Sequence, residues 1–199
     1  HQAFEIISDV HGKTAKYLEI INNTDLPTIQ LGDLGFKTTH DWFIQNVLTP
    51  DLRHRVMFGN HDYYPYLDKP YSCGNFAAFD NGRIVTIRGA ASIDKIFRTE
   101  GEDWFENEEL NFAEAYQALE FVLQTKPEII ISHDCPDIAK NVMFAGRTSY
   151  SSRTSNLLTG ILDAYKPKQW IFGHWHQSTT ANIEGVQFRC LSELESIVV

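Results

Sequence analysis

Histidine, aspartate and asparagine side chains gather in short clusters, each directly after an apolar run. A polar residue at the end of an apolar run is typical of a buried strand that ends at a binding edge. If the runs are neighbouring strands of an open α/β sheet, the clusters converge on one edge, where their mixed nitrogen and oxygen donors suit a divalent metal. The five clusters are Asp9-Val10-His11, Gly32-Asp33, Gly59-Asn60-His61-Asp62, Ser132-His133 and Gly173-His174-Trp175-His176.

The spacing within the clusters favours two metal ions over one. Asp9 and His11 are two residues apart, as are His174 and His176, and residues i and i+2 of an extended chain point the same way. The set exceeds the need of one tetrahedral zinc and fits two ions that share a carboxylate and a water. Two ions about 3.5–4 Å apart clamp a phosphoryl displacement and acidify that water to hydroxide. The predicted ligands are Asp9, His11, Asp33, Asn60, His133, His174 and His176, with His61 left over.

Each cluster also has an ordinary explanation when it is taken alone. An aspartate after glycine is common in turns, and a single histidine such as His133 is more often a hydrogen-bonded structural residue than a ligand. Five such clusters, all at predicted strand ends, are difficult to explain as solvated turns. Together they favour the metal site.

The elements that must position the clusters can be predicted from hydrophobic periodicity. Residues 4–8, 28–31 and 55–58 are predicted strands, and residues 14–22 and 41–48 are predicted helices. This β-α-β-α-β order implies parallel strands with right-handed crossovers.

The rest of the chain adds antiparallel hairpins and then resumes the alternation. Turn residues 80–82 join predicted strands 76–79 and 83–88, and residues 184–185 join strands 179–183 and 186–190. Asn111 is predicted to cap a helix that ends near residue 124. The remaining predictions are strands 128–132 and 169–172, a helix at 155–165, a loop or frayed helix at 138–154, and no clear period over 89–109. We therefore predict one α/β domain over residues 1–199, with two β-sheets between helices.

Composition narrows the classes of protein to which the chain can belong. Hydrophobic residues make up 43% of its 199 residues, which allows a sizeable core. A formal charge of −9 disfavours long duplex nucleic acid as a partner, although bound cations can reverse the local sign. The three cysteines are scattered without a C-x-x-C pair, which suggests a reducing compartment, and we expect a cytoplasmic protein. No apolar run approaches the ~18 residues of a membrane span.

The ordered motifs D-x-H, G-D, G-N-H-D, a single H after a strand, and G-H-x-H resemble those of the calcineurin-like metallophosphoesterases. The resemblance extends from Asp9 to His176 and so covers nearly the whole chain. It implies a four-layer α-β-β-α sandwich with two mixed sheets that hydrolyses phosphate esters with two metals. It also implies a division of the ligands: Asp9, His11 and His176 on the first metal, Asn60, His133 and His174 on the second, and Asp33 bridging.

The resemblance also implies a role for His61. It matches the motif histidine that stands near the leaving group and acts as the general acid. An imidazole suits that role because it can hold a proton near neutral pH.

One stretch departs from the pattern of the family's protein phosphatases, Gly-Asp-x-x-Asp-Arg-Gly. Here Phe36 replaces the aspartate that orients the catalytic histidine, and Lys37 replaces the phosphate-binding arginine. Lysine is a point charge and lacks the arginine fork. Asp62 is expected either to steady His61 or to cap the following turn. The departure argues against a dedicated Ser/Thr protein phosphatase and favours the small bacterial or phage-like members.

Four arginines are further candidates for substrate contacts beside Lys37. Residues 88–95 resemble a stretch of small prokaryotic members, so Arg88 or Arg98 is predicted to reach the phosphate; an ion pair of Arg98 with an acidic neighbour is the alternative. Arg147 and Arg153 follow His133 and are candidates for a second phosphate or a nucleotide.

The predicted function is therefore a dinuclear metal-dependent phosphoesterase in which a metal-bridging hydroxide attacks the ester. Alternatives are a Ser/Thr or Tyr protein phosphatase, a nuclease or cyclic-nucleotide phosphodiesterase, and a non-catalytic scaffold of the same fold. The complete ligand set with His61 argues against the scaffold. Mn²⁺ is the expected metal, and Fe, Zn²⁺ or Ni²⁺ also fit the donors. The expected partner is a phosphate-ester substrate; no membrane is expected, and the sequence indicates no particular protein partner.

Overall fold

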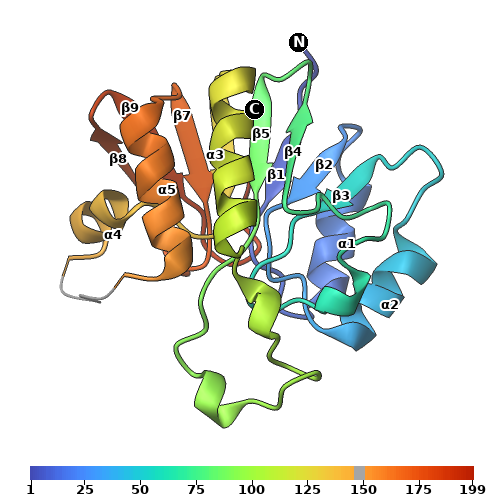
Figure 1. The fold of residues 1–199 in the computed structure, drawn as a ribbon. Helices are drawn as coiled ribbons and strands as arrows, with labels where there is room; N and C mark the ends of the chain where they lie inside the picture. The colour runs from blue at the N-terminus through green and yellow to red at the C-terminus, as the bar shows by residue number, and fades with distance from the viewer. Residues whose placement is uncertain (146–150) are drawn as a thin grey trace.

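The computed structural model describes residues 1–145 and 151–199, and their strands form two sheets (Figure 1). In the first sheet, β1 (Glu5–Ile7), β2 (Thr28–Gln30) and β3 (His54–Val56) are parallel, as predicted. The strand β10 (Ser196–Val198) pairs antiparallel with β1 and makes this sheet mixed. Sequence analysis missed β10 because three residues are too few to show a period.

The second sheet has the strand order β4-β5-β6-β7-β9-β8. Its four central strands are parallel, and the two predicted hairpins supply its antiparallel edges. The strands are β4 (Phe76–Phe79), β5 (Ile84–Ile87), β6 (Ile129–Ser132), β7 (Gln169–Phe172), β8 (Thr179–Ile183) and β9 (Val186–Cys190).

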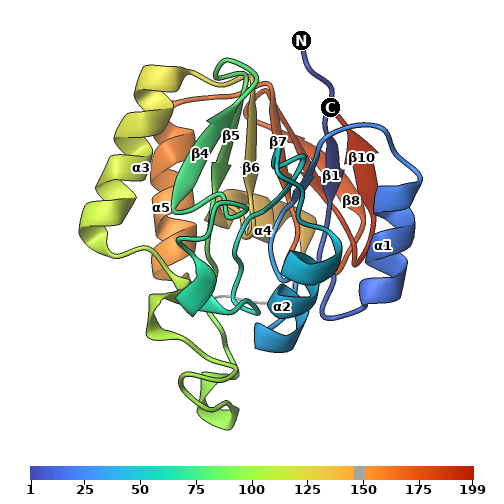
Figure 2. The ribbon, with the colours of Figure 1, turned by 90° about the vertical axis from the view of Figure 1, so that its right-hand side faces the viewer.

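Helices cover the outer faces of both sheets, which gives the predicted four layers (Figure 2). Helices α1 (Thr14–Asn22) and α2 (Lys37–Asn46) pack on the first sheet. Helices α3 (Phe112–Thr125) and α5 (Arg153–Ala164) pack on the second, and α4 (Asp137–Met143) lies within the segment predicted as a loop or frayed helix.

Three apolar clusters fill the spaces between the layers, and strand periodicity sorts residues among them. In β6, Ile130 packs under α3 and α5, whereas Ile129 and Ile131 face the other sheet. Neighbouring residues of a strand point to opposite faces, so a strand that is buried on both sides must be apolar throughout. In the first sheet, Ile6 faces the partner sheet and Ile7 faces the helices.

The start of α3 agrees with its predicted capping residue, whereas α5 begins at Arg153, two residues before its predicted start. The side chain of Asn111 accepts a hydrogen bond from the backbone N–H of Glu114 and caps α3, as predicted. Helix α2 begins at Lys37, whereas residue 41 was predicted, because its first turn is polar and shows no apolar period. This difference brings the start of α2 next to the candidate site.

Residues 89–109, which we call the arm, leave the sandwich between β5 and α3. The arm projects from one end of the molecule in both views (Figures 1 and 2). It contains two short 3-10 helices, η2 (Lys95–Phe97) and η3 (Glu106–Glu108); a third, η1 (Tyr64–Tyr66), precedes β4. Near η2 the arm exposes Ile93, Ile96 and Phe97.

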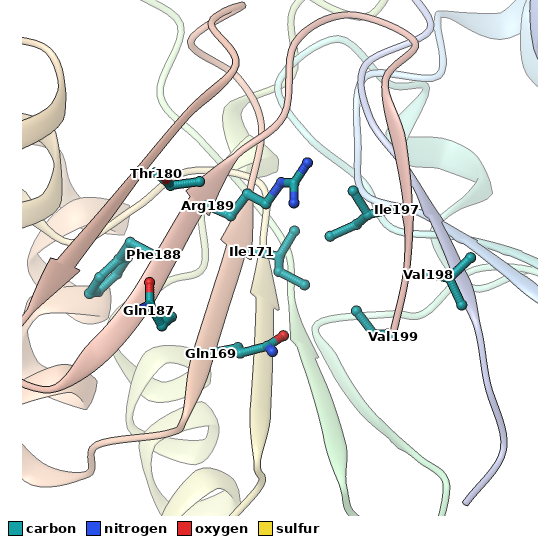
Figure 3. Close-up of a pocket in the computed structure, with 9 residues that line it drawn as sticks. All are labelled: Gln169, Ile171, Thr180, Gln187, Phe188, Arg189, Ile197, Val198 and Val199. Atoms are coloured by element: carbon teal, nitrogen blue, oxygen red, sulfur yellow. The ribbon is translucent and has the colours of Figure 1, made fainter.

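A hollow of about 310 Å³ lies where β10 approaches the second sheet (Figure 3). Ile171 and Ile197 face each other across this seam, and Arg189 extends into it. Its lining residues come from β7, β8, β9 and the chain after Glu195, and it contains none of the predicted ligands. No helix among the described residues is long and apolar enough to span a bilayer.

Candidate metal centre

The predicted ligands follow the carboxyl ends of five strands, but these strands belong to two sheets. Asp9, Asp33 and Asn60 come after β1, β2 and β3 of the first sheet. His133 and His174 come after β6 and β7 of the second. The five runs are therefore not all neighbours in one sheet, which was the condition for their meeting at a single edge. Two sheets packed face to face bring their carboxyl ends together equally well.

Histidine nitrogens and aspartate oxygens at these strand ends form three overlapping groups, and within each group the atoms lie within 4.8 Å of one another. Two groups share Asp33, which therefore lies between them. The groups are Asp9 with His11 and His176, His11 with Asp33 and His61, and Asp33 with His133 and His174.

Around Asp9, three potential ligands converge on one point. The Nε2 atoms of His11 and His176 lie 3.2 Å apart, and they lie 3.5 and 3.7 Å from Oδ2 of Asp9. The other oxygen of Asp9 accepts hydrogen bonds from Ser8 Oγ and from the backbone N–H of His174. The carboxylate is thus held with one oxygen turned toward both imidazoles.

Around Asp33, the second group converges in the same way. Nε2 of His133 lies 3.2 Å from Asp33 Oδ1, and Nδ1 of His133 is 3.1 Å from the carbonyl oxygen of Leu31. A bond from Nδ1–H to that carbonyl leaves the Nε2 lone pair free to bind a cation. The ring of His174 lies edge-on to that of His133, with centroids 5.1 Å apart.

Whether a cation fits here can be judged from the buried polar atoms that have no hydrogen-bond partner. Five such side-chain atoms occur among the described residues, and three of them belong to the predicted ligands: Asp9 Oδ2, Asn60 Oδ1 and His133 Nε2. An unpaired buried acceptor costs about 1–3 kcal/mol, and a bound cation removes that cost. The donor set therefore fits divalent metal ions.

Three glycines leave the space that the ligands occupy. A Cβ on Gly59 would lie 2.3 Å from Asp33 Oδ1, and one on Gly32 would lie 2.4 Å from His133 Nδ1. A Cβ on Gly173 would lie 2.4 Å from Asp9 Oδ1. The glycines that precede Asp33, Asn60 and His174 are thus required by close approach of side chains.

Four of the predicted ligands have a left-handed backbone: His11, Asp33, His174 and His176, with φ between 49° and 69°. This conformation costs about 1–2 kcal/mol for a residue with a Cβ. Strain of this kind concentrates at functional sites, where the surrounding structure holds it in place.

The charges of the site favour a bound cation. Burial would raise the pKa of Asp33, but His133 and His61 outweigh burial and hold it well below its usual value. Burial would lower the pKa of His133, but Asp33 and Asp9 outweigh burial and raise it to about 10. A potential that binds a proton so strongly at Nε2 attracts a metal cation to the same lone pair. Burial lowers the pKa of His174, which leaves it neutral and able to ligate.

Asp62 ties together the two loops that carry Asp33 and Asn60. It is fully buried, and neither of its expected roles describes it, because its side-chain hydrogen bonds run to both loops and to His40 and not to the His61 imidazole. His40, on α2, lies 2.8 Å from Asp62 and 2.7 Å from the Tyr71 hydroxyl. Its carboxylate accepts from the backbone N–H groups of Asp33, Leu34, Gly35 and Gly59.

His61 lies at the edge of the cluster between Asp33 and the arm. Its Nδ1 is 3.0 Å from Asp33 Oδ2, and Arg98 Nη2 donates to its Nε2 at 2.6 Å. The ring of Phe36 packs beside it, with centroids 5.9 Å apart. In this chain Asp33 therefore takes the orienting contact that Phe36 cannot make. A cavity of about 220 Å³ opens beside His61 and His11, lined also by Phe36 and the first turn of α2.

The predicted substrate contacts Arg98 and Lys37 differ in their partners and in their exposure to solvent. Arg98 adjoins His61 and pairs with Asp94, the acidic neighbour that was the alternative. Lys37, at the start of α2, pairs with Asp41 at 2.6 Å and is largely exposed.

Arg88 is a correction, because it lies inside the fold with only 2% of its surface exposed. Its guanidinium donates to Asn75 Oδ1 and to the carbonyl of Asn107, and stacks over Tyr64. A buried charge needs such partners, and the structure shows the guanidinium bound to them and not directed at His61.

Of the two arginines after His133, the structure describes Arg153, which makes hydrogen bonds within the protein. Arg153 donates to the carbonyl oxygens of Leu110 and Glu109. Arg147 lies outside the described residues.

Sequence analysis missed two arm residues that support Asn60. The amide nitrogen of Asn60 donates to Ser92 Oγ at 3.2 Å, which fixes the orientation of the amide and leaves Oδ1 without a hydrogen-bond partner. Glu108 in turn accepts from both the backbone N–H and the hydroxyl of Ser92. Burial raises the pKa of Glu108 against these hydrogen bonds. The only sequence signal was that Ser92 belongs to the stretch 88–95, to which no chemistry could be assigned.

The family model for calcineurin-like phosphoesterases matches residues 4–178. The chain belongs to this family. The expected metallophosphoesterase fold is thereby confirmed, and so is the expected class of enzyme, a metal-dependent phosphoric ester hydrolase. No curated protein matches the sequence at a significant level.

Two solved structures show the same fold at low sequence identity. Phosphopantetheinyl hydrolase from Mycobacterium tuberculosis is 15% identical with a TM-score of 0.53, and the match covers 96% of this chain and 90% of that one. A candidate 5′-nucleotidase from Staphylococcus aureus, in complex with alpha-ketoglutarate, is 15% identical with a TM-score of 0.51. That match covers 98% of this chain and 50% of the other, so this chain spans half its length.

Proposed function

We propose that the protein hydrolyses phosphate esters at two divalent cations held by the seven predicted ligands. The observation that carries the proposal is the set of overlapping His/Asp groups that share Asp33, at the carboxyl ends of both sheets. Two buried oxygens of the predicted ligands, Asp9 Oδ2 and Asn60 Oδ1, also have no hydrogen-bond partner, and such atoms are rare in folded proteins.

The geometry supports a division of the ligands between two ions. Asp9, His11 and His176 would hold one, since their ligating atoms form one group. His133 and His174 would hold the other with Asn60, and Asp33 would bridge because it belongs to groups on both sides. Bound divalent cations supply Lewis acidity, which stabilises charge on the phosphoryl oxygens and lowers the pKa of water.

His61 is proposed as the general acid. Asp33 Oδ2 holds its Nδ1, so its Nε2 is directed away from the carboxylate and toward the arm. Nε2 accepts from Arg98 in this structure, so the role requires that the substrate take the place of Arg98 and that Nε2 carry a proton. That proton can then pass to the leaving oxygen of an ester that lies in the cavity beside His61 and His11. Because His61 also belongs to one of the candidate ligand groups, metal content must be measured together with rate.

The cavity and the charge favour a small ester over a long nucleic acid. About 220 Å³ accommodates a phosphate with a modest substituent, and the net charge of −9 would repel a phosphate backbone. Lys37, at the start of α2, is proposed to attract the outer charge of the substrate.

The test measures hydrolysis of para-nitrophenyl phosphate and of its bis-ester with Mn²⁺, Fe²⁺, Zn²⁺ or Ni²⁺. His61→Ala should lower kcat by about 10²- to 10⁴-fold and leave the metal content unchanged. His174→Ala should lower both. Full metal binding without turnover of any monoester, diester or cyclic nucleotide would favour the scaffold alternative. Loss of metal in His61→Ala would make His61 a ligand.

A further inference from the structure

The two terminal nitrogens of the Arg98 guanidinium have different partners: Nη1 bonds to groups that hold the side chain in place, and Nη2 lies beside His61. Its Nη1 donates to the carbonyl oxygens of Asn60 and Asp103 at 3.3 and 3.2 Å, and to Ser92 Oγ at 3.1 Å. These partners hold one half of the fork within the protein. The side chain is only 7% exposed. Arg98 is therefore fixed in place before any substrate arrives.

The other half of the fork faces the site. Nη2 lies 2.6 Å from His61 Nε2 and 2.8 Å from Asp94 Oδ1. An ester oxygen that takes a proton from His61 Nε2 must come within hydrogen-bond distance of that nitrogen. Since Nη2 already lies there, the same oxygen, or another oxygen of the same phosphate, comes within reach of Arg98.

Arg98 is also the cation best placed to meet a phosphate among the described residues. The guanidinium of Arg88 is buried among partners other than His61, and Lys37 is exposed and paired with Asp41. An arginine fork binds a phosphate and a carboxylate with the same geometry. Asp94, whose side chain is 51% exposed, therefore presents to Arg98 the kind of anion that a substrate would bring.

We propose that Arg98 binds the substrate phosphate through Nη2, and that Asp94 occupies this position in the free enzyme as an internal competitor. The proposal rests on the proposed function, because it takes a phosphate ester as the ligand. Substrate binding replaces the Asp94 carboxylate by a phosphate oxygen and frees His61 Nε2 from Arg98. Asp94 is the exposed partner of the pair, with 51% of its side chain open to water, so it can turn into solvent when a phosphate dianion takes its place.

The exchange predicts opposite effects for the two partners. Asp94→Asn removes the competing charge and should lower KM for para-nitrophenyl phosphate about two- to five-fold, with kcat within two-fold. Arg98→Ala should raise KM at least ten-fold, and Arg98→Lys should restore part of the loss. In the Arg98→Ala background, Asp94→Asn should change nothing, because the two residues act through one contact. Lys95→Ala is the matched control: it removes a positive charge from the same turn, beside Trp104, and should leave KM unchanged.

Binding of inorganic phosphate, measured by calorimetry on the Mn²⁺-loaded protein, separates this proposal from the proposed function. The same order of affinities, Asp94→Asn above wild type above Arg98→Ala, is expected without turnover. If that order is found and no ester is hydrolysed, the proposed function fails and the Arg98 site stands. An unchanged affinity in Arg98→Ala overturns the site. A gain from Asp94→Asn that persists in the Arg98→Ala background overturns the exchange, because it is then a general charge effect.

Discussion

The Nε2 atoms of His11 and His176 lie 3.2 Å apart, although 165 residues separate them in the chain. Their rings stack with centroids 4.9 Å apart and an interplanar angle of 22°. At this distance one imidazole can donate to the other, with the roles set by the tautomers. Both nitrogens also lie within 4 Å of Asp9 Oδ2, so a divalent cation could take a lone pair from each imidazole in place of that hydrogen bond.

Metal addition should therefore stabilise the protein through this contact. A ligand at 100 times its dissociation constant adds about 2.7 kcal/mol, which for a chain of this size raises Tm by roughly 5–10 °C per site. Mn²⁺ added to chelator-treated protein should produce such a rise in a fluorescence melt. His176→Ala should lose the part contributed by the first ion. His1→Ala, which removes an exposed histidine beside Asp80, should keep the full rise. An equal rise in His176→Ala and wild type would rule out His176 as a ligand.

Gly59 should tolerate no side chain, because its neighbours are ligands. An added Cβ would lie 2.3 Å from Asp33 Oδ1 and 2.7 Å from His133 Nε2. Displacing these atoms should weaken metal binding by about 10- to 100-fold, the usual effect of disturbing the supports of a metal site. Calorimetric titration of Gly59→Ala with Mn²⁺ measures the loss.

Gly160 in α5 is the matched control, since a Cβ there meets nothing within 4 Å. Gly160→Ala should bind metal normally and gain up to about 1 kcal/mol in the free energy of unfolding, because alanine favours a helix interior. Normal metal binding by Gly59→Ala would contradict the packing described for the site.

Asp62 should stabilise the folded protein through the hydrogen bonds that its carboxylate accepts. It accepts four backbone N–H groups and lies 2.8 Å from His40 Nε2. Asp62→Asn replaces one acceptor by an NH₂ group that faces other donors, which should cost about 2–3 kcal/mol in the free energy of unfolding. Urea denaturation of the metal-free protein measures this, with the exposed Asp25→Asn as control. A loss no larger than that of Asp25→Asn would show that the loops do not depend on Asp62.

Much of the site geometry could be predicted because a polar residue directly after a buried strand must lie at the carboxyl end of a sheet. Asp9 and His174 follow runs that are apolar on both faces, and the carboxyl ends of such strands can meet only at the end of the sandwich. The start of α1 at Thr14 and the cap of α3 at Asn111 also carried local signals. What these signals lacked was the assignment of strands to sheets. The same clusters would have followed from one sheet or from two.

The arm could not be predicted, for a physical reason. Its residues have no period, because they are held by polar contacts with distant parts of the chain. Arg88 shows the consequence: as a charged residue it was expected at the substrate, yet Asn75 and Asn107 provide partners that let it be buried. Ser92 and Glu108 support Asn60 through contacts that span 32 and 16 residues. Such contacts leave no mark on local sequence.

His54 gives the fold a pH dependence that is independent of the metal centre. It lies on β3, is 3% exposed, and its Nδ1 is 2.9 Å from the hydroxyl of Thr28. Burial, aided by Arg53, lowers its pKa from 6.5 to about 4. The unfolded chain therefore binds a proton at a higher pH than the folded chain does. The stability from neutral His54 is complete above about pH 6.5 and is lost as the pH falls toward 4.

The shift corresponds to about 2–3 kcal/mol of unfolding free energy between pH 7 and pH 4.5. In His54→Gln, which has no titrating group at this position, the metal-free protein should lose less stability than wild type by roughly that amount over the same interval. Urea denaturation at the two pH values measures both slopes, and comparing them cancels the titration of the site histidines. Parallel curves for the two proteins would mean that His54 is protonated as easily in the folded chain as in the unfolded one.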